Sequence, residues 1–408
     1  MPAMTVLEQA AEYGDFYVPR FEIRASGSGL DDQIIRDVTQ VVYKDNLKEI
    51  DSFELTVGNW DPQTLRFKYL EPDAITTATP ASPSVLRYKV FEPAACDFEL
   101  LLGYGSKLTS MTHGSVTTLE PTFPAGGAAT LTVRALNVLH RLRDKQRSQH
   151  WFSKRESEIA KSIKTLNDPA TQRKISVRVS DKAQSKEQPL DYVAQDNQYD
   201  IDFLFTRARL AGYVVFVDVE NKPNGKEEQF LYFGPSDEKH PRVRDVTYEL
   251  EWGKSLIDFK PVLSTANQVK SVEVRSWNRQ TNKAIRAKVG LDDPDIQVNR
   301  DLLPLLTQSG RQPREEVVAN EPQPTPQQAE RRARAILSDR LKEMVTAHGT
   351  TVGLPELRSG QRIRIKGLGA KFSGTYFVTE TTHTLNDSGY ITAFTARREE
   401  ALSGGGGL

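Results

Sequence analysis

Two distant segments of this 408-residue chain repeat one pattern. In each, a strand-like run ends in Gly-x-Gly-x-Lys plus an apolar residue, and a glycine precedes a Val-Thr pair. A glycine turn then opens a threonine-containing run that ends in arginine. The first copy spans residues 98–134 and the second spans residues 363–397. Because such a repeat is typical of one structural unit used twice, the sequence predicts a β-rich domain in two copies with the middle of the chain between them.

Alternating apolar and polar residues predict strands throughout both copies. Phe21 and Ile23 alternate with polar neighbours, and apolar residues occupy every second position of 53–57, as half-buried strands require. The β-branched run 39–43 is expected to pair with 53–57. The Thr-, Ser- and Pro-rich stretch 76–84 predicts a loop. Further strands are predicted at 86–91, 98–102, 115–119, 129–133, 247–252, 268–277 and within 361–397.

The middle of the chain carries helical signals instead. Ser153 and Glu156 have the spacing of a capping box before a helical apolar pattern. A second helix is predicted at 200–210, with Gly212 as its stop. Two strand patterns follow within 213–233. This block therefore predicts a small α+β unit.

A third helix start follows the Pro- and Gln-rich segment 301–324, which we interpret as a crossing linker. Thr325 fits the N-cap, Pro326 the first helical position, and Gln328 completes a capping box. Gly349 stands where a glycine after the helix end is expected. Four arginines cluster on the exposed side of this predicted helix, namely Arg331, Arg332, Arg334 and Arg340. We favour a solvated face for them over contact with an acidic patch of a neighbouring subunit.

Charge and composition exclude several classes of protein. The 54 Lys and Arg residues balance 54 Asp and Glu residues, without the basic excess typical of proteins that grip nucleic-acid backbones. The single cysteine, Cys96, excludes a disulfide framework and any multi-cysteine metal site. We find no signal-peptide pattern and no long apolar run, so the chain is expected to be soluble and not exported by a signal peptide.

No motif predicts catalysis or a cofactor. The Gly-x-Gly pairs resemble phosphate loops, but Leu108 and Phe372 stand where a dinucleotide fingerprint needs a third glycine. The stretch 292–295 lacks the spaced ligands of a calcium loop. The six histidines have no metal-ligand spacing, and His383 is interpreted as a strand residue. A nucleophile elbow is absent and Cys96 has no catalytic signature, so we predict no catalytic, cofactor-binding or metal-binding residue and expect no enzyme.

The residues of the second copy resemble a known family. The run 353–378, followed by His383 and 389–395, resembles the closing signature of the late-control protein D family. This family comprises baseplate hub proteins of contractile phage tails and injection systems, and the hub part of type VI valine-glycine repeat spike proteins. The pattern at 102–124 is similar to the first tube domain of such hubs, and 195–213 to their helical insert. Thr112 and His113 depart from it, since an aromatic or aliphatic residue is expected before Gly114.

This resemblance implies a mechanical role. Two tube-type β-barrel domains per chain, with an α+β insert, would give a β-dominated α+β fold that assembles as a pseudo-sixfold homotrimeric ring. Such a ring adapts a hexameric inner tube to a trimeric spike. The implied partners are other copies of the chain, the inner tube protein, other baseplate subunits and a separate spike protein, because the chain ends at Leu408. The implied place is a phage tail or tail-like particle, virion or injection machine, assembled in the bacterial cytoplasm.

The hub interpretation predicts which strands meet between subunits. Residues 98–102 with 114–119, and 361–365 with 376–380, are expected to pair across subunit boundaries. The predicted interface residues are Phe98, Leu100, Leu102, Gly114, Val116, Ile363, Ile365, Gly374, Tyr376 and Val378. Positive and negative side chains are expected to segregate between subunit contacts and lumen.

The predicted organisation has five parts. These are a first tube-like domain at 1–142, an α+β insert at 143–240, a strand-rich connection and linker at 241–324, a helix with the second tube-like domain at 325–402, and a flexible tail at 403–408. An alternative function is a cell-wall or glycan-binding module of a surface-associated protein. It would use aromatic side chains of the α+β insert to stack on sugars, namely Tyr192, Tyr199, Tyr213 and Tyr232.

Overall fold

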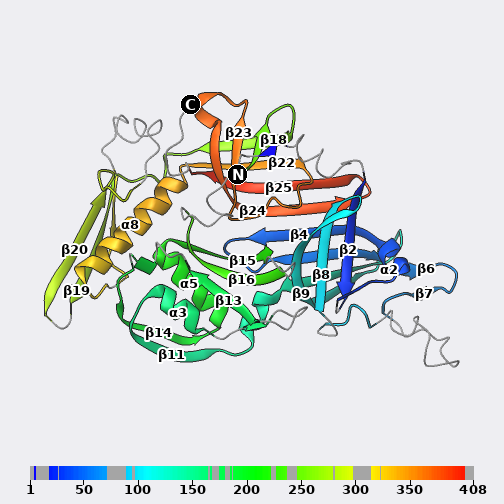
Figure 1. The fold of residues 1–408 in the computed structure, drawn as a ribbon, viewed down its shortest axis with the longest axis horizontal. Coiled ribbons are helices and arrows are strands. Elements are labelled where there is room, and N and C mark those ends of the chain that lie inside the picture. Colours follow the sequence, from blue (N-terminus) through cyan, green and yellow to red (C-terminus); the bar gives the residue numbers. More distant parts are fainter. Residues whose placement is uncertain are drawn as a thin grey trace.

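The computed structural model describes residues 4–5, 18–25, 27–70, 89–93, 97–163, 166–167, 174–179, 184–185, 187–221, 227–236, 246–278, 281–296, 314–321 and 323–399. A large sheet fills the right-hand and upper part of Figure 1, and two smaller bodies lie to its left. The predicted loop 76–84, residue Cys96 and the tail 403–408 lie outside the described residues. No helix in the described ranges is long and apolar enough to cross a bilayer.

The first copy of the repeat is a five-stranded antiparallel unit with the strand order β4-β5-β10-β9-β8. Its pairing of 39–43 with 53–57 is as predicted, with Val41 opposite Leu55. β2 (Pro19–Ala25) lies beyond β8, and β3 (Ser28–Gly29) pairs with the end of β2. The bounds of the five strands are Val38–Asn46 for β4, Ser52–Gly58 for β5, Asp97–Tyr104 for β8, Lys107–Thr122 for β9 and Thr130–Asn137 for β10.

The second copy has the same topology. Its order is β18-β22-β25-β24-β23, again antiparallel throughout and with the strands in the same chain order as in the first copy. β17 (Val246–Glu251) lies beyond β23, and β1 (Met4–Thr5) beyond β17. The bounds are Leu256–Leu263 for β18, Val345–Val352 for β22, Arg362–Lys366 for β23, Gly374–Asn386 for β24 and Gly389–Arg398 for β25.

β-bulges align the two copies residue by residue. β9 has one extra residue, Thr117, against β10, and β24 has one, Thr379, against β25. β4 has an extra Thr39 against β5, and β18 has an extra Ile257 against β22. Because bulges at matching positions mark matching strands, the two copies share one strand pattern. The alignment corrects one detail of the sequence pattern, since Arg134 corresponds to Thr395 and not to the arginine that closes the second run.

The two copies join edge to edge within the chain. The first part of β24 pairs with β23, whereas its second part, residues 380–386, pairs antiparallel with β4 of the first copy. We call this pairing the internal seam. It produces one continuous run of eight strands, β18-β22-β25-β24-β4-β5-β10-β9. Two closed barrels were expected, but the strand pairings of the described residues close neither copy into a barrel.

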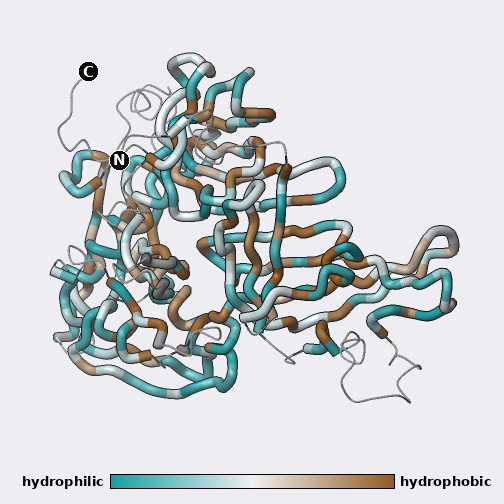
Figure 2. Tube along the Cα trace, turned by 45° about the vertical axis from the view of Figure 1, so that its right-hand side comes forward, coloured by the Kyte–Doolittle hydropathy of each residue, from teal (hydrophilic) through white to brown (hydrophobic). Residues whose placement is uncertain are grey.

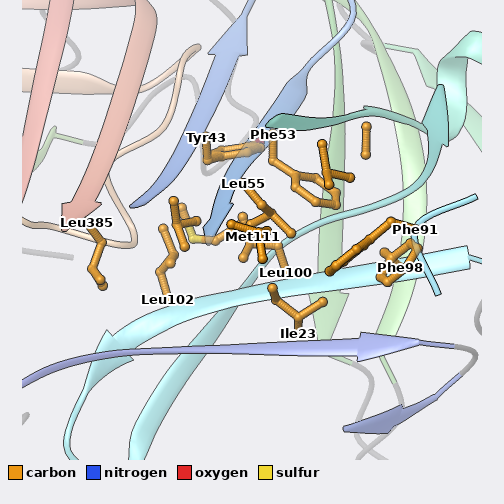
Figure 3. Packing of buried hydrophobic residues seen from close by; sticks show 14 of the residues in the cluster. Ile23, Tyr43, Phe53, Leu55, Phe91, Phe98, Leu100, Leu102, Met111 and Leu385 are labelled. Atoms are coloured by element: carbon orange, nitrogen blue, oxygen red, sulfur yellow. The ribbon is translucent and has the colours of Figure 1, made fainter. Parts of the chain in front are cut away.

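Apolar residues at every second position form the core. In Figure 2 brown and teal segments alternate along the strands of the sheet. Figure 3 shows side chains of β2, β4, β5 and β8 converging on the interior of the first copy, with Leu385 of β24 at its margin. The second copy has its own core around Ile363, Ile365, Tyr376 and Val378. Each copy thus buries one face of the sheet, and the internal seam continues the sheet from one copy into the other.

An α+β body follows the first copy. Helix α5 (Asp200–Ala211) packs in its core with Val215 of β15 and Phe233 of β16. The helix ends at Gly212, which has a φ of +71°. The remaining elements are η2 (Val138–Arg143), β11 (Arg147–Lys154), α3 (Glu156–Ser162), β12 (Leu166–Asn167), β13 (Lys174–Val179), β14 (Leu190–Gln198), β15 (Tyr213–Asn221) and β16 (Glu227–Pro235).

A second small body lies between β18 and β22. Helix α8 (Pro326–Lys342) begins at the predicted N-cap, where the Thr325 hydroxyl accepts a hydrogen bond from the Gln328 amide at 3.3 Å. The helix packs on β19 (Ser271–Asn278) and β20 (Lys283–Gly290), beside β21 (Glu315–Val318). The division at 324 is therefore corrected. α8 shares a core with the preceding strands, while β17 and β18 belong to the second sheet unit and are no mere connection.

Three local predictions were wrong. Ser153 lies in β11, and α3 instead begins after Arg155, whose amide donates to Glu158 at 2.8 Å. Gly349 lies inside β22, because α8 ends earlier and a Cβ at this glycine would lie 2.5 Å from the Phe394 ring. Of the predicted strand 86–91, the described residues 89–91 form turns. Short elements complete the chain: α2 (Asp32–Asp37), β6 (Trp60–Asp61), β7 (Arg66–Phe67) and α9 (Gly369–Phe372).

Candidate assembly surface

The ten predicted interface residues lie inside the chain. Phe98 of β8 is opposite Gly114 of β9, and Ile363 of β23 is opposite Tyr376 of β24, so the two predicted strand pairs form within one subunit. Their larger side chains are buried, and Figure 3 shows Phe98, Leu100 and Leu102 pointing into the core of the first copy. The pairing expected between subunits is therefore made within the chain. Sequence alternation identified these residues because they are core residues.

The internal seam was missed by sequence reasoning, although it shows how one copy can join another. Its register sets Glu380 opposite Asn46, Thr382 opposite Lys44 and Leu385 opposite Val41. The Leu47 amide donates to the Thr379 carbonyl at 3.2 Å where the seam begins. No local signal identifies this pairing, because β4 and β24 are far apart in the sequence. The repeat was the available clue, since the strand edges of two similar sheet units can pair with each other.

A buried charge network fixes the internal seam. Asp45 of β4 is 1% exposed, and its carboxylate accepts hydrogen bonds from the Ser359 amide at 3.0 Å and from the Ser359 hydroxyl. The Arg358 guanidinium lies 4.0 Å from the same carboxylate and 4.7 Å from the centre of the Tyr43 ring. Burial opposes the charge of Arg358, but Tyr43 and nearby carboxylates outweigh it and keep its pKa raised. Both copies thus contribute to one polar cluster.

His383 lies beside this cluster, in β24 as predicted for a strand residue. Its Nε2 lies 3.0 Å from the Leu357 carbonyl, and its Nδ1 lies 2.9 Å from the Tyr390 hydroxyl and 3.1 Å from that of Thr392. Burial, aided by the positive charge of Arg358, lowers the pKa of His383 to about 3. The described residues contain no group of three or more His, Cys, Asp or Glu placed to hold a metal. The neutral His383 ring is thus held by polar contacts to the Leu357 carbonyl and to the Tyr390 and Thr392 hydroxyls.

We expect acid to weaken the fold through His383. The unfolded chain binds a proton there below about pH 6.5, whereas the folded chain does so only near pH 3, so stability is lost as the pH falls. Between pH 6.5 and 4.5 this amounts to about 2 kcal/mol for one proton. Denaturant unfolding at both pH values should show that extra loss in the native protein relative to His383→Asn. Equal pH dependence of the two proteins would contradict the assignment.

The solvent side of the sheet mixes both signs of charge. Arg134 of β10 lies 2.9 Å from Glu54 of β5 and 3.1 Å from Glu120 of β9, forming a ladder across three strands. The expected segregation of charge between subunit contacts and lumen stays a prediction. Arg332, Arg334 and Arg340 of α8 are paired within the chain, with Glu321, Asp293 and Glu316 respectively. Intramolecular ion pairs therefore replace both the freely solvated face and the acidic partner patch considered for these three arginines.

Polar residues stand where the hub pattern has an aromatic or aliphatic one. Thr112 and His113 are buried in β9. The His113 Nε2 lies 3.2 Å from the Ser110 hydroxyl and 3.3 Å from the Glu99 carboxylate. The departure is therefore accommodated by a local polar cluster.

The aromatic residues proposed for sugar stacking do not form one surface. Tyr232 is buried, and the Tyr213 hydroxyl is bonded to Glu187 at 2.9 Å while burial raises its pKa. Tyr199 is half-buried at the start of α5. Tyr192 is exposed, beside Phe152 on β11. The arrangement gives no support to the glycan-binding alternative.

Comparison with solved structures identifies the fold. The 43 kDa tail protein of prophage MuSo2 from Shewanella oneidensis is similar over 93% of this chain and 98% of its own, with a TM-score of 0.61 and 14% identity. A tail protein from Neisseria meningitidis is similar over 94% of this chain and 97% of its own, with a TM-score of 0.58 and 13% identity.

A third similar structure comes from a secretion machine. The E. coli c3393 protein, a component of the type VI secretion system described as similar to the bacteriophage T4 tail proteins gp27 and gp5, covers 93% of this chain and 77% of its own, with a TM-score of 0.52 and 13% identity. At these identities the likeness shows a shared fold. No curated protein sequence matches the chain. A family model described as the Alg8 N-terminal domain matches residues 84–387, most of the sequence, and the chain belongs to this family.

Proposed function

We propose that the protein is a structural baseplate hub of a contractile tail or injection system. Three copies form a ring that adapts a hexameric inner tube to a trimeric spike and transmits force without chemistry. The main observation behind this proposal is the repeated five-stranded unit. Three chains with two copies each would present six similar units to a hexameric tube. The fold shared with prophage tail proteins and a type VI secretion component supports this role, as does the resemblance to the late-control protein D family.

The proposed partners follow from this role. They are two further copies of the chain, the inner tube protein, a trimeric spike protein and other baseplate subunits. The proposed place is a phage tail or tail-like particle assembled in the bacterial cytoplasm. The core residues first expected at subunit contacts would act indirectly, because they hold together the sheet whose edges would form the contacts.

Light scattering after size-exclusion chromatography tests the ring. We expect a mass three times the 45.8 kDa of one chain. A protein that stays monomeric at about 100 μM, well above the Kd of a specific interface, would contradict the proposal. Mixing with the candidate spike should then shift the three-chain peak as a whole.

A further inference from the structure

The internal seam has a counterpart whose two edges have no strand partner among the described residues. One edge of β24 has two strand partners. The first part of β24 pairs with β23, and residues 380–386 pair with β4. The matching edge of β9 pairs with β8 as far as Ser115, and beyond that point the described residues provide no strand partner for 117–122 on this side. β18, which matches β4, pairs with β22, and its other edge has no strand partner among the described residues at 257–263. The continuous eight-stranded run thus ends in two matching halves of a seam.

The matching bulges transfer the register from one seam to the other. Thr379 corresponds to Thr117 and Thr39 to Ile257. Glu380 opposite Asn46 then becomes Thr118 opposite Ser264, Thr382 opposite Lys44 becomes Glu120 opposite Val262, and Thr384 opposite Val42 becomes Thr122 opposite Lys260. We propose that residues 117–122 of β9 in one subunit pair antiparallel with β18 of the next subunit in this register. The inference rests on the proposed ring and names the surface that closes it.

Side-chain chemistry matches on both faces of the proposed seam. Leu119 and Leu263 would face each other on the core side, and each packs half-buried against the core of its own copy. On the solvent side Val262 is 45% exposed, whereas native edge strands are often protected by charged side chains. Glu120 and Lys260 would be diagonal neighbours of opposite charge. The pairing therefore covers exposed apolar surface and places unlike charges together.

Two prolines make this seam poorer in hydrogen bonds than the internal seam. Pro121 and Pro261 would lie opposite each other, where the internal seam has His383 and Tyr43. The Ser264 amide bonds back to Met344 at 2.9 Å, so by strand alternation the nitrogen of Pro261 points out of its own sheet. The proposed seam therefore lacks two central hydrogen bonds that the internal seam can make. Prolines on both edges also disfavour pairing with unrelated strands.

Disulfide trapping tests the register. Glu120 and Val262 would form a non-hydrogen-bonded pair, in which facing side chains approach closely enough for a disulfide. In a Cys96→Ser background, Glu120→Cys with Val262→Cys should yield covalent dimers and trimers on a non-reducing gel. The control pairs Glu120→Cys with Asp258→Cys. Asp258 lies on the same face as Val262 but about 13 Å away along β18, so this control should yield at least tenfold less covalent dimer and trimer.

The possible outcomes test the proposed seam and the proposed ring separately. Trimers without this cross-link, or with equal cross-linking in the control, would overturn the seam and leave the proposed function standing. A monomer in every variant and in the native protein would overturn both. The Cys96→Ser parent must itself match the native oligomeric mass.

A second variant tests the same surface without oxidation. Val262→Asp places a negative charge opposite Glu120 and should weaken trimerisation at least about tenfold, because like charges are costly at an interface. Thr56→Asp, on the solvent side of β5 in the middle of the sheet, should leave trimerisation unchanged. Circular dichroism should show both variants folded, since both side chains have access to solvent. Equal trimerisation of the two would count against the seam.

Discussion

Replacing Asp45 with alanine is expected to destabilise the chain by about 3–5 kcal/mol, the range for removing one partner of a buried charge cluster. The substitution leaves the Arg358 guanidinium buried without its nearest carboxylate and removes the acceptor of both hydrogen bonds from Ser359. Because Asp45 belongs to the first copy and Arg358 to the second, the loss should loosen the internal seam. Denaturant unfolding measured by circular dichroism gives the change in free energy.

Asp45→Asn is the matched control for shape. It keeps an oxygen acceptor for Ser359 but removes the negative charge. We expect a loss between that of alanine and zero. Loss of less than about 1 kcal/mol in Asp45→Ala, the level of an ordinary surface pair, would mean that the network does not hold the two copies together.

Gly114→Ala is expected to destabilise the first copy by about 3 kcal/mol, at the upper end for overpacking. A Cβ at this position would lie 2.0 Å from the Leu136 carbonyl oxygen, so β9 must move away from β10. Thermal unfolding should show the loss. Gly126→Ala, in the loop between the same strands and with no atom within 4 Å of its added Cβ, should change stability by less than about 0.5 kcal/mol. Similar behaviour of the two variants would contradict the close strand approach.

The sequence predicted features that local chemistry decides. Helix α5 ends at Gly212 and α8 begins at Thr325 because backbone geometry and capping act over a few residues. Strands β4 and β5 were predicted to pair because alternation and a short connection suffice. Gly349 was misassigned because a glycine required by the Phe394 ring looks the same in sequence as one that ends a helix.

Prediction of the assembly surface failed for a different reason. Phe98 and Ile363 were expected at subunit contacts, yet they lie in cores. Buried core strands and subunit contacts share the same alternating apolar pattern, so the pattern does not distinguish them. The internal seam depends on pairing between β4 and β24, which are distant in sequence, and the open edges appear only once the two copies are aligned through Thr117 and Thr379. The strand pairings of the described residues were needed to separate paired edges from edges that lack a strand partner there.

Electron microscopy of the purified protein tests the central claim most directly, namely that three chains close the repeated sheet into one ring. End-on views should show six similar units around a central opening. Eight strands per chain, spaced by about 4.8 Å and tilted, predict a backbone ring about 40–50 Å across for three chains. Separate single chains, or an assembly without this threefold ring, would contradict the account.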